Sequence, residues 1–215
     1  MSRMWRMSVF DLALGRDPVR LPAPAFRFVY AVSGRIEGRS DDGSGVAEAG
    51  SGFLTRGEVE LRGPADAWIY EADPSAASPL GRPGLLPVLS RRFELPDDAP
   101  RLIRADRIES PAGAQTPRHG HRGPGIRRLL YGRLLAEVGD TVERIEPGQP
   151  WFETGRDPVV GTNIALGNSA FVRVMVLPAE LHGGKNSFVP TTSDEAAKPR
   201  AVASLLFGEV LQQYV

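Results

Sequence analysis

The sequence predicts an all-β protein built from two copies of one β unit, and three observations support this fold class. The 215 residues include 24 Gly and 19 Pro, a composition typical of many short strands joined by frequent turns. Apolar runs are short, and none approaches the roughly 18 residues of a transmembrane helix. Most specifically, glycines and apolar positions of the first half recur in the second half in one ungapped register, which favours two domains over one.

The repeat is clearest in its glycines, which mark turns. The matching pairs, each 98 positions apart, are Gly15 and Gly113, Gly34 and Gly132, Gly50 and Gly148, and Gly57 and Gly155. Apolar positions match between them, because Val9-Phe10-Asp11 lies over Arg107-Ile108-Glu109. Four glycine matches in one register with apolar residues between them are not expected by chance.

We expect the first copy to contain seven short strands. They are Trp5 to Leu14, Ala25 to Val32, Arg35 to Glu37, Gly45 to Glu48, Gly52 to Leu54, Val59 to Leu61 and Ala67 to Ala72. Asp42-Gly43 is typical of a hairpin turn. The segment from Asp73 to Pro87 combines four prolines with Gly and Ser, which neither a helix nor a central strand accommodates. We therefore expect this segment to link the copies.

We expect seven strands in the second copy as well. They are Leu102 to Glu109, Ile126 to Tyr131, Leu134 to Val138, Val142 to Ile145, Pro150 to Phe152, Val159 to Ile164 and Phe171 to Leu177. Near the C-terminus, Asp194 to Lys198 fits a helical turn stopped by Pro199. For Ala201 to Val210, a closing strand is favoured over a helix.

Charge and cysteine content exclude several classes of partner. Lys+Arg and Asp+Glu each total 26, and this balance argues against a nucleic-acid or polybasic membrane surface. The absence of cysteine excludes a disulfide framework, a thiolate nucleophile and a cysteine-based zinc site. Met1 to Gly15 carries charges among its apolar residues and lacks the core of a signal peptide. We expect a soluble, cytoplasmic protein that binds neither nucleic acid nor membrane.

The most informative stretch is Pro117 to Gly125, which contains His119 and His121. Residues i and i+2 of a strand point to the same side, so both imidazoles can face one space. Imidazole is a ligand for zinc, iron, nickel, copper and manganese. Two strand histidines on a polar face are the alternative interpretation of the same pattern.

The surroundings of this stretch resemble the cupin superfamily. Gly113, the Pro-x-His-x-His core, a strand ending at Gly132 and Pro147-Gly148 before an aromatic strand carry the resemblance. It covers about Leu102 to Pro178, and reaches the N-terminal half mainly through the repeat. It implies two tandem cupin barrels (double-stranded β-helix, or jelly-roll), an RmlC-like bicupin. Stretches such as GPGIR and FVRVMVLP are similar to uncharacterised bacterial cupins, which implies a fold and not a reaction.

This resemblance divides the chain into two expected domains. Residues 1–90 would form an N-terminal barrel, and residues 91–215 a C-terminal barrel with a C-terminal extension. Barrel edges need covering, and the N-terminal copy has an apolar set in Phe26, Phe28 and Tyr30. We therefore expect a homodimer, or tight packing of the barrels within the chain.

The predicted site departs from the family pattern at two positions. The family's first glutamate ligand falls at Gly125 and its second-motif histidine at about Pro158, so only His119 and His121 match family ligands. Glu153, on the following aromatic strand, is inferred as a substitute ligand; a solvent-facing strand end is the alternative.

The first copy offers no corresponding ligands. At its equivalent positions it has Leu21, Ala23 and Thr55, and none of these is a strong metal ligand. We therefore expect one divalent transition metal, Fe, Mn, Ni or Zn, in the C-terminal barrel only. His182 is interpreted as a loop residue.

Arginines cluster around the predicted site, at Arg118, Arg122, Arg127 and Arg128. If position 125 faces the barrel interior, the strand period sends Arg127 inward as well. A charge inside a small barrel requires a partner. That partner is either Glu153, in competition with a metal, or an anionic substrate, which would make Arg127 a catalytic residue. The alternative places Arg127 in solvent and Arg128 inside.

Three functions remain open at this level. The first is a metal-dependent oxygenase or isomerase, in which His119, His121 and Glu153 hold the metal and Arg127 orients a small anionic or enolisable substrate. In it Trp151 and Phe152 would help to exclude water. The second is a non-catalytic protein that binds or senses a small ligand. The third, a storage or purely structural protein, is disfavoured because the polar cluster occurs in one half only.

Overall fold

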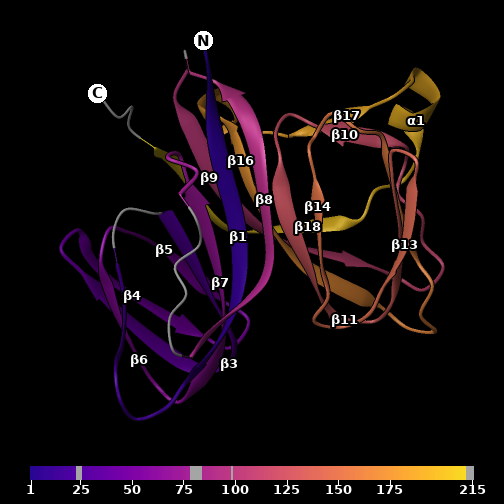
Figure 1. The fold of residues 1–215 in the computed structure, drawn as a ribbon. Coiled ribbons are helices and arrows are strands. Elements are labelled where there is room, and N and C mark those ends of the chain that lie inside the picture. Colours follow the sequence, from indigo (N-terminus) through magenta and orange to yellow (C-terminus); the bar gives the residue numbers. More distant parts are fainter. Residues whose placement is uncertain (23–25, 78–83, 98, 212–215) are drawn as a thin grey trace. The chain divides into compact units, whose positions relative to one another are not determined.

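The computed structural model describes residues 1–22, 26–77, 84–97 and 99–211 (Figure 1). The described chain is nearly all β, with one short α-helix and one 3₁₀ turn. It divides into two compact units, Met1–Asp98 and Ala99–Val215. None of the helices in these ranges is long and apolar enough to cross a membrane.

The N-terminal unit contains strands β1 to β8. They are β1 (Ser2–Leu14), β2 (Val19–Leu21), β3 (Phe26–Ser40), β4 (Gly43–Glu48), β5 (Gly52–Arg56), β6 (Val59–Arg62), β7 (Ala65–Asp73) and β8 (Leu85–Pro96). The sheet order is β2-β6-β3-β7-β1-β8, and β4 and β5 also pair with β3. The long strand β3 pairs with β5 and β7 along its first part and with β4 and β6 along its second.

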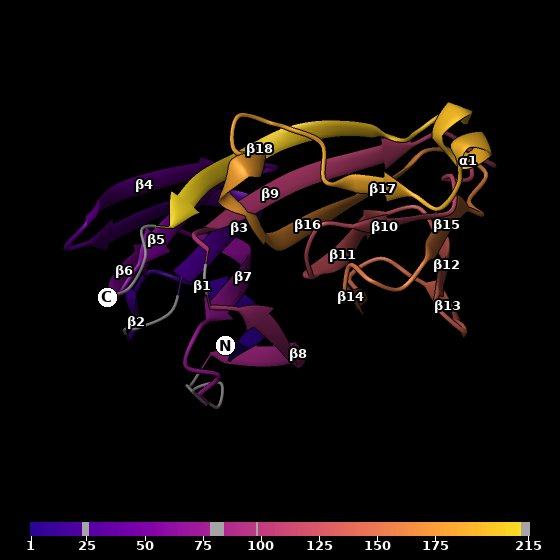
Figure 2. The ribbon, with the colours of Figure 1, turned by 90° about the horizontal axis from the view of Figure 1, so that it is seen from above.

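The C-terminal unit contains the remaining elements. They are β9 (Arg101–Ser110), β10 (His119–His121), β11 (Gly125–Tyr131), β12 (Leu134–Val138), β13 (Thr141–Ile145), β14 (Pro150–Glu153), β15 (Val159–Asn163), β16 (Ser169–Pro178), the 3₁₀ turn η1 (Ala179–Leu181), β17 (Phe188–Pro190), α1 (Ser193–Ala197) and β18 (Val202–Leu211). Two five-stranded sheets result, β13-β12-β15-β10-β17 and β14-β11-β16-β9-β18. Figure 2 shows β16, β9 and β18 side by side along the second sheet.

The predicted repeat is visible in the strand pairing. The partial order β5-β3-β7-β1-β8 of the first unit corresponds to β14-β11-β16-β9-β18 of the second. Equivalent turn hydrogen bonds follow the same register, because Gly50 N donates to Ala31 O and Gly148 N to Leu129 O, both at 2.8 Å. A register shift follows each acceptor, between Ala31 and Ser33 and between Leu129 and Tyr131. The two halves therefore pair their strands in the same way.

Gly34 and Gly132 occupy equivalent positions, but only Gly132 follows a strand end, because β3 continues through Gly34. Their φ angles are +70° and +86°, a region that favours glycine. A Cβ at Gly34 would lie 3.0 Å from Cα of Ala65, the first residue of β7, and a Cβ at Gly132 would lie 2.7 Å from Cα of Ser169, the first residue of β16. The backbone approach at each site thus requires glycine.

Several expected boundaries differ from the structure. Arg35 to Glu37 is not a separate strand, because β3 continues through Gly34 to Ser40. Strands β2, β8 and β17 were not expected. The predicted linker begins in β7 and ends in β8, while its residues 78–83 lie outside the described residues, as do Ala23 and Ala25. Because β8 runs to Pro96 along β1, the compact units divide after Asp98 and not at the expected residue 90.

Buried apolar side chains form clusters in each unit. In the first, one such cluster includes Phe10, Leu85 and Leu21, the counterpart of His119. In the second, a cluster around Leu129 and Trp151 is separate from another around Met175. The predicted strand and helical turn near the C-terminus are both confirmed, as β18 and α1.

Candidate functional site in the C-terminal unit

A cavity of about 300 Å³ lies in the C-terminal unit. Apolar side chains from several strands form most of its wall, among them Trp151, Phe171 and Phe188. His119, His121, Arg127, Glu153 and Arg173 supply its main polar groups. A mostly apolar cavity with a few convergent polar groups is the usual form of a small-molecule site.

The strand period places both histidines in this cavity. His119 and His121 are two residues apart on β10, so their side chains share one face. They are 6% and 7% exposed, and their ring centroids lie 4.8 Å apart with the planes at 88°. Between them, Gly120 allows close approach of the next loop, because a Cβ there would lie 2.9 Å from Gly155 O.

The imidazole of His119 is fixed from two sides. Its Nδ1 lies 2.7 Å from Pro117 O, and since a carbonyl only accepts, Nδ1 carries the hydrogen and Nε2 has a lone pair. The ring of Phe188 stacks on it at 4.3 Å. Burial lowers the pKa of His119, although Pro117 and Glu153 act in the opposite direction. The ring is therefore neutral at pH 7, as a metal ligand must be.

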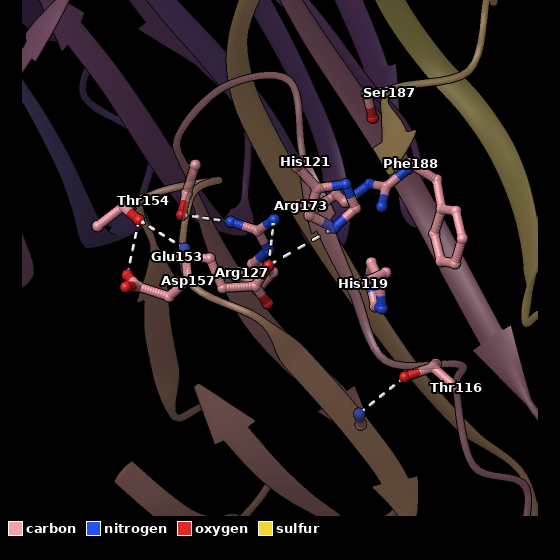
Figure 3. Close-up of polar contacts among 12 residues, drawn as sticks. Thr116, His119, His121, Arg127, Glu153, Thr154, Asp157, Arg173, Ser187 and Phe188 are labelled. Carbon is pink, nitrogen blue, oxygen red and sulfur yellow. Dashed lines mark hydrogen bonds and ion pairs between the residues drawn. The ribbon is translucent and has the colours of Figure 1, made fainter. Parts of the chain in front are cut away.

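The imidazole of His121 has fewer polar partners than that of His119. Nδ1 is buried and has no hydrogen-bond partner, while Nε2 lies 3.6 Å from Glu153 Oε2 (Figure 3). Burial, with the charges of Arg127 and Arg173 next in size, holds the pKa of His121 well below its usual range. This ring too is neutral at pH 7.

Glu153 and Arg127 form a buried ion pair at the cavity wall. The Arg127 Nη2 lies 2.6 Å from Glu153 Oε2, and the two side chains are about 1% and 5% exposed. Neither atom has an aligned hydrogen bond, so the attraction is chiefly Coulombic. Trp151 Nε1 donates to the other oxygen, Oε1, at 2.9 Å. Figure 3 shows the Glu153 carboxylate between Arg127 and His121.

The absence of a side chain at Gly125 makes room for this pair. Gly125 pairs with Glu153 on β14, so the carboxylate comes from the strand beside the position where the cupin pattern has its glutamate. Arg127 Nη1 donates to Gly125 O at 2.6 Å, and a Cβ at Gly125 would lie 3.1 Å from that nitrogen. Burial lowers the pKa of Arg127 to about 10, so it remains charged at pH 7.

Two further arginines, Arg173 and Arg200, line the cavity, and the sequence interpretation missed both. Arg173 on β16 is the cross-strand partner of Arg127, and its Nε donates to Asp106 Oδ2 at 2.9 Å. Arg104 donates to the same oxygen at 3.2 Å. Three guanidinium groups thus face two carboxylates, and the neutral histidines leave an excess of positive charge. A single arginine two residues after Phe171 in an apolar strand was the available signal.

The other expected site residues lie as follows. Arg118 and Arg122 are exposed. The alternative with Arg128 inside the cavity is wrong, because Arg128 donates to Gly148 O at 2.7 Å while Arg127 lines the cavity. Phe152 is not among the residues that line it, since successive strand residues face opposite sides. His182 is exposed after η1, consistent with its interpretation as a loop residue.

The donor types present suit a transition-metal ion, but their arrangement does not, because Arg127 already engages Oε2 of Glu153. Nε2 of His119 has a free lone pair, and both Nδ1 of His121 and Oε2 of Glu153 are buried without a hydrogen bond. Neutral imidazole with carboxylate is the donor chemistry of such ions. No three His, Asp or Glu side chains in the described parts of the chain are grouped so that they could hold a metal ion.

Comparisons with known proteins place the fold. No family model matches the chain, and no curated protein matches it. A variant of oxalate decarboxylase from Bacillus subtilis superposes with a TM-score of 0.63 at 10% identity, covering 90% of this chain and 73% of that one. For AerE from Microcystis aeruginosa the values are 0.57, 14%, 80% and 87%. For a cupin 2 conserved barrel domain protein from Leptotrichia buccalis they are 0.51, 12%, 82% and 88%. An all-β chain with this strand order and these neighbours has the cupin fold.

Proposed function

We propose that the C-terminal unit is a metal-binding cupin barrel that acts on, or binds, a small organic anion. His119 and His121 hold one divalent transition metal, and Glu153 is the third protein ligand. The observation that supports this most is the pair of buried, neutral imidazoles at the wall of a cavity. The N-terminal unit is a second cupin barrel without metal ligands, and the whole is a bicupin.

The metal remains open among Fe, Mn, Ni and Zn, because imidazole and carboxylate donors suit all four. The Bacillus subtilis oxalate decarboxylase is described as having Mn(II) centres. Bound between the histidines, a divalent ion would supply a Lewis acid that polarises an oxygen of the ligand. Pro117 O orients His119 for this role by fixing its tautomer.

The charges of the cavity favour an anionic occupant. Arg127 and Arg173 carry positive charge, and their fork of N–H donors matches a carboxylate or an enolate. Trp151, Phe171 and Phe188 form apolar walls that exclude water and accept the rest of the molecule. A volume of about 300 Å³ limits the ligand to a small molecule.

Elemental analysis tests the metal site. Protein purified without a His-tag and reconstituted should contain one divalent ion per chain. His119→Ala and His121→Ala should each lose nearly all of it, and Glu153→Ala should lose part, because water can replace one ligand. His182→Ala is the matched control, since that histidine is exposed and away from the cavity. Full metal content in the double histidine variant would place the site elsewhere.

A second candidate is a metal-free cavity that binds a small anion without turnover. The Arg127–Glu153 ion pair favours it, because that pair already occupies the carboxylate needed as a ligand. No metal above background after reconstitution, together with binding of a carboxylate, would establish this alternative. Metal content with oxygen-dependent turnover would instead establish an oxygenase.

A further inference from the structure

Arg200 is a cavity residue that has no role in the proposed function. It lies between α1 and β18, in the segment that also brings Ala201 and Ala203 to the cavity wall. Its side chain is exposed, and its guanidinium carbon lies 4.4 Å from the centroid of the Phe188 ring. Phe188 is itself stacked on His119 at 4.3 Å. An aromatic face therefore holds the positive charge of Arg200 at the wall of the cavity.

The chain before Arg200 is anchored beside the histidine strand. Glu195 of α1 accepts a hydrogen bond from the backbone N–H of Arg118 at 2.7 Å, and Thr191 N donates to Arg118 O at 3.1 Å. Pro199 then restricts the backbone immediately before Arg200. The contact with the ring is therefore not the only constraint on where this arginine lies.

The other two arginines lining the cavity already have carboxylate partners. Arg127 pairs with Glu153 at 2.6 Å and is also attracted by Asp106, and Arg173 donates to Asp106 at 2.9 Å. An anion bound to either of them would lie close to a carboxylate that repels it. In the described parts of the chain, the side chain of Arg200 has neither an ion pair nor a hydrogen bond. Stacking leaves the N–H groups along its edge open to a carboxylate.

We propose that Arg200 binds the carboxylate of the ligand, so that the apolar part of the ligand enters the cavity and its charge stays toward the solvent. The inference rests on the proposed anion-binding cavity, requires no metal ion, and names the ligand class as a small aromatic carboxylate. Trp151 and Phe171 in the wall favour a planar apolar body, and a volume of about 300 Å³ favours a single ring. Binding in this orientation leaves the buried ion pairs of the cavity intact.

Calorimetric titration with benzoate and with benzamide tests this orientation. The two probes share one ring, but only benzoate carries a charge. The wild type should bind benzoate about tenfold more tightly than benzamide, a gain typical of charge-assisted hydrogen bonds. Arg200→Gln should reduce this preference to below about twofold and leave the Kd of benzamide unchanged, because the apolar wall is kept. A merely structural role of Arg200 would weaken the binding of both probes equally, which would contradict the proposal.

Two further variants and a change of salt sharpen the test. Arg156→Gln is the matched control, because Arg156 is exposed and does not line the cavity, and it should keep the wild-type preference for benzoate. Arg200→Lys keeps the charge but loses the planar fork, so it should retain part of the preference. Added salt should weaken the preference in the wild type, because the charge of an exposed arginine is screened.

The outcomes separate this inference from the proposed function. A preference for benzoate that survives Arg200→Gln and is lost in Arg173→Gln would overturn the inference alone, because the anion would then bind at the buried arginine. Equal affinity of the wild type for both probes would overturn the inference together with the proposed anion-binding cavity. A wild type that binds neither probe would exclude an aromatic carboxylate and with it the inference, and metal content would decide the proposed function separately.

Discussion

The two histidines of the cavity are kept neutral by their surroundings. Burial is the largest cause for both, and it lowers the pKa because the charged form loses its hydration. Several charged or titratable groups also face His121. They are Arg104, Arg127, Arg173, Glu153 and His119. The positive groups exceed the negative ones, so their sum disfavours an imidazolium, and the site offers a metal two lone pairs near neutral pH.

These lowered pKa values predict that the metal-free protein loses stability in mild acid. In the unfolded chain the pKa of a histidine is about 6.5. Below that pH the unfolded state therefore binds protons that the folded state does not bind. The contribution is fully present above about pH 6.5 and is lost as pH falls toward the lowered folded values. Chemical unfolding between pH 7.5 and 5.5 should show this decline.

The control for this prediction is a comparison of variants. A protein with both His119→Gln and His121→Gln should have a flatter dependence of the free energy of unfolding on pH. His182→Gln should keep the wild-type slope, because that side chain is exposed. Equal slopes in all three proteins would show that the cavity histidines do not resist protonation.

At the scale of the elements, the same strand pairing places different side chains at equivalent positions of the two units. Arg27 of β3 corresponds to Gly125 of β11. Arg27 is buried, pairs with Glu71 at 2.6 Å and donates to Gly57 O at 2.6 Å. Both of these partners of the Arg27 guanidinium belong to the N-terminal unit. In the C-terminal unit this position has no side chain, so Arg127 and Glu153 can meet there.

Gly125→Ala should therefore disturb the site and the packing of β11 together. The added Cβ would lie 2.5 Å from Val174 O and 2.7 Å from Met175 Cγ, both on the adjacent strand β16. Overpacking of this kind costs about 1–3 kcal/mol, and denaturant unfolding should show the loss. Gly167→Ala is the control, because nothing lies within 4 Å of a Cβ there. Equal stability of the two variants would contradict the close approach.

At the scale of the whole molecule, the exposed sheet edge bears on assembly. β18 ends the order β14-β11-β16-β9-β18, and its residues Val202 and Leu205 are 66% and 55% exposed. Exposed apolar side chains on an edge strand favour association. The set expected to drive assembly, Phe26, Phe28 and Tyr30, is instead buried within the chain.

We predict a homodimer, and light scattering of the purified protein measures it. A mass of twice the 23.3 kDa chain is the expected result. Val202→Asp combined with Leu205→Asp should shift the mass toward the monomer if β18 forms the contact, whereas Val142→Asp, at another exposed apolar position, should not. A monomeric wild type at all concentrations would refute the dimer.

The sequence alone determined the fold class, the repeat and the strand that carries the histidines. Glycine spacing and two-residue periodicity can be read from the sequence itself, so recognising them requires no knowledge of tertiary contacts. The same periodicity allowed an inward Arg127 that pairs with Glu153, but it left open the outward alternative and a substrate anion as the partner. For the same reason, the sequence predicted the C-terminal strand and the helical turn, but not the residues at which they begin and end.

Only the tertiary structure decided what surrounds those residues. The meeting of Arg173 with Asp106, and the stacking of Phe188 on His119, join residues far apart in the chain, which no local pattern encodes. Strand pairing also set Glu153 opposite Gly125. A carboxylate thus lies across the sheet from position 125, because side chains on adjacent strands are neighbours in space whatever their separation in sequence.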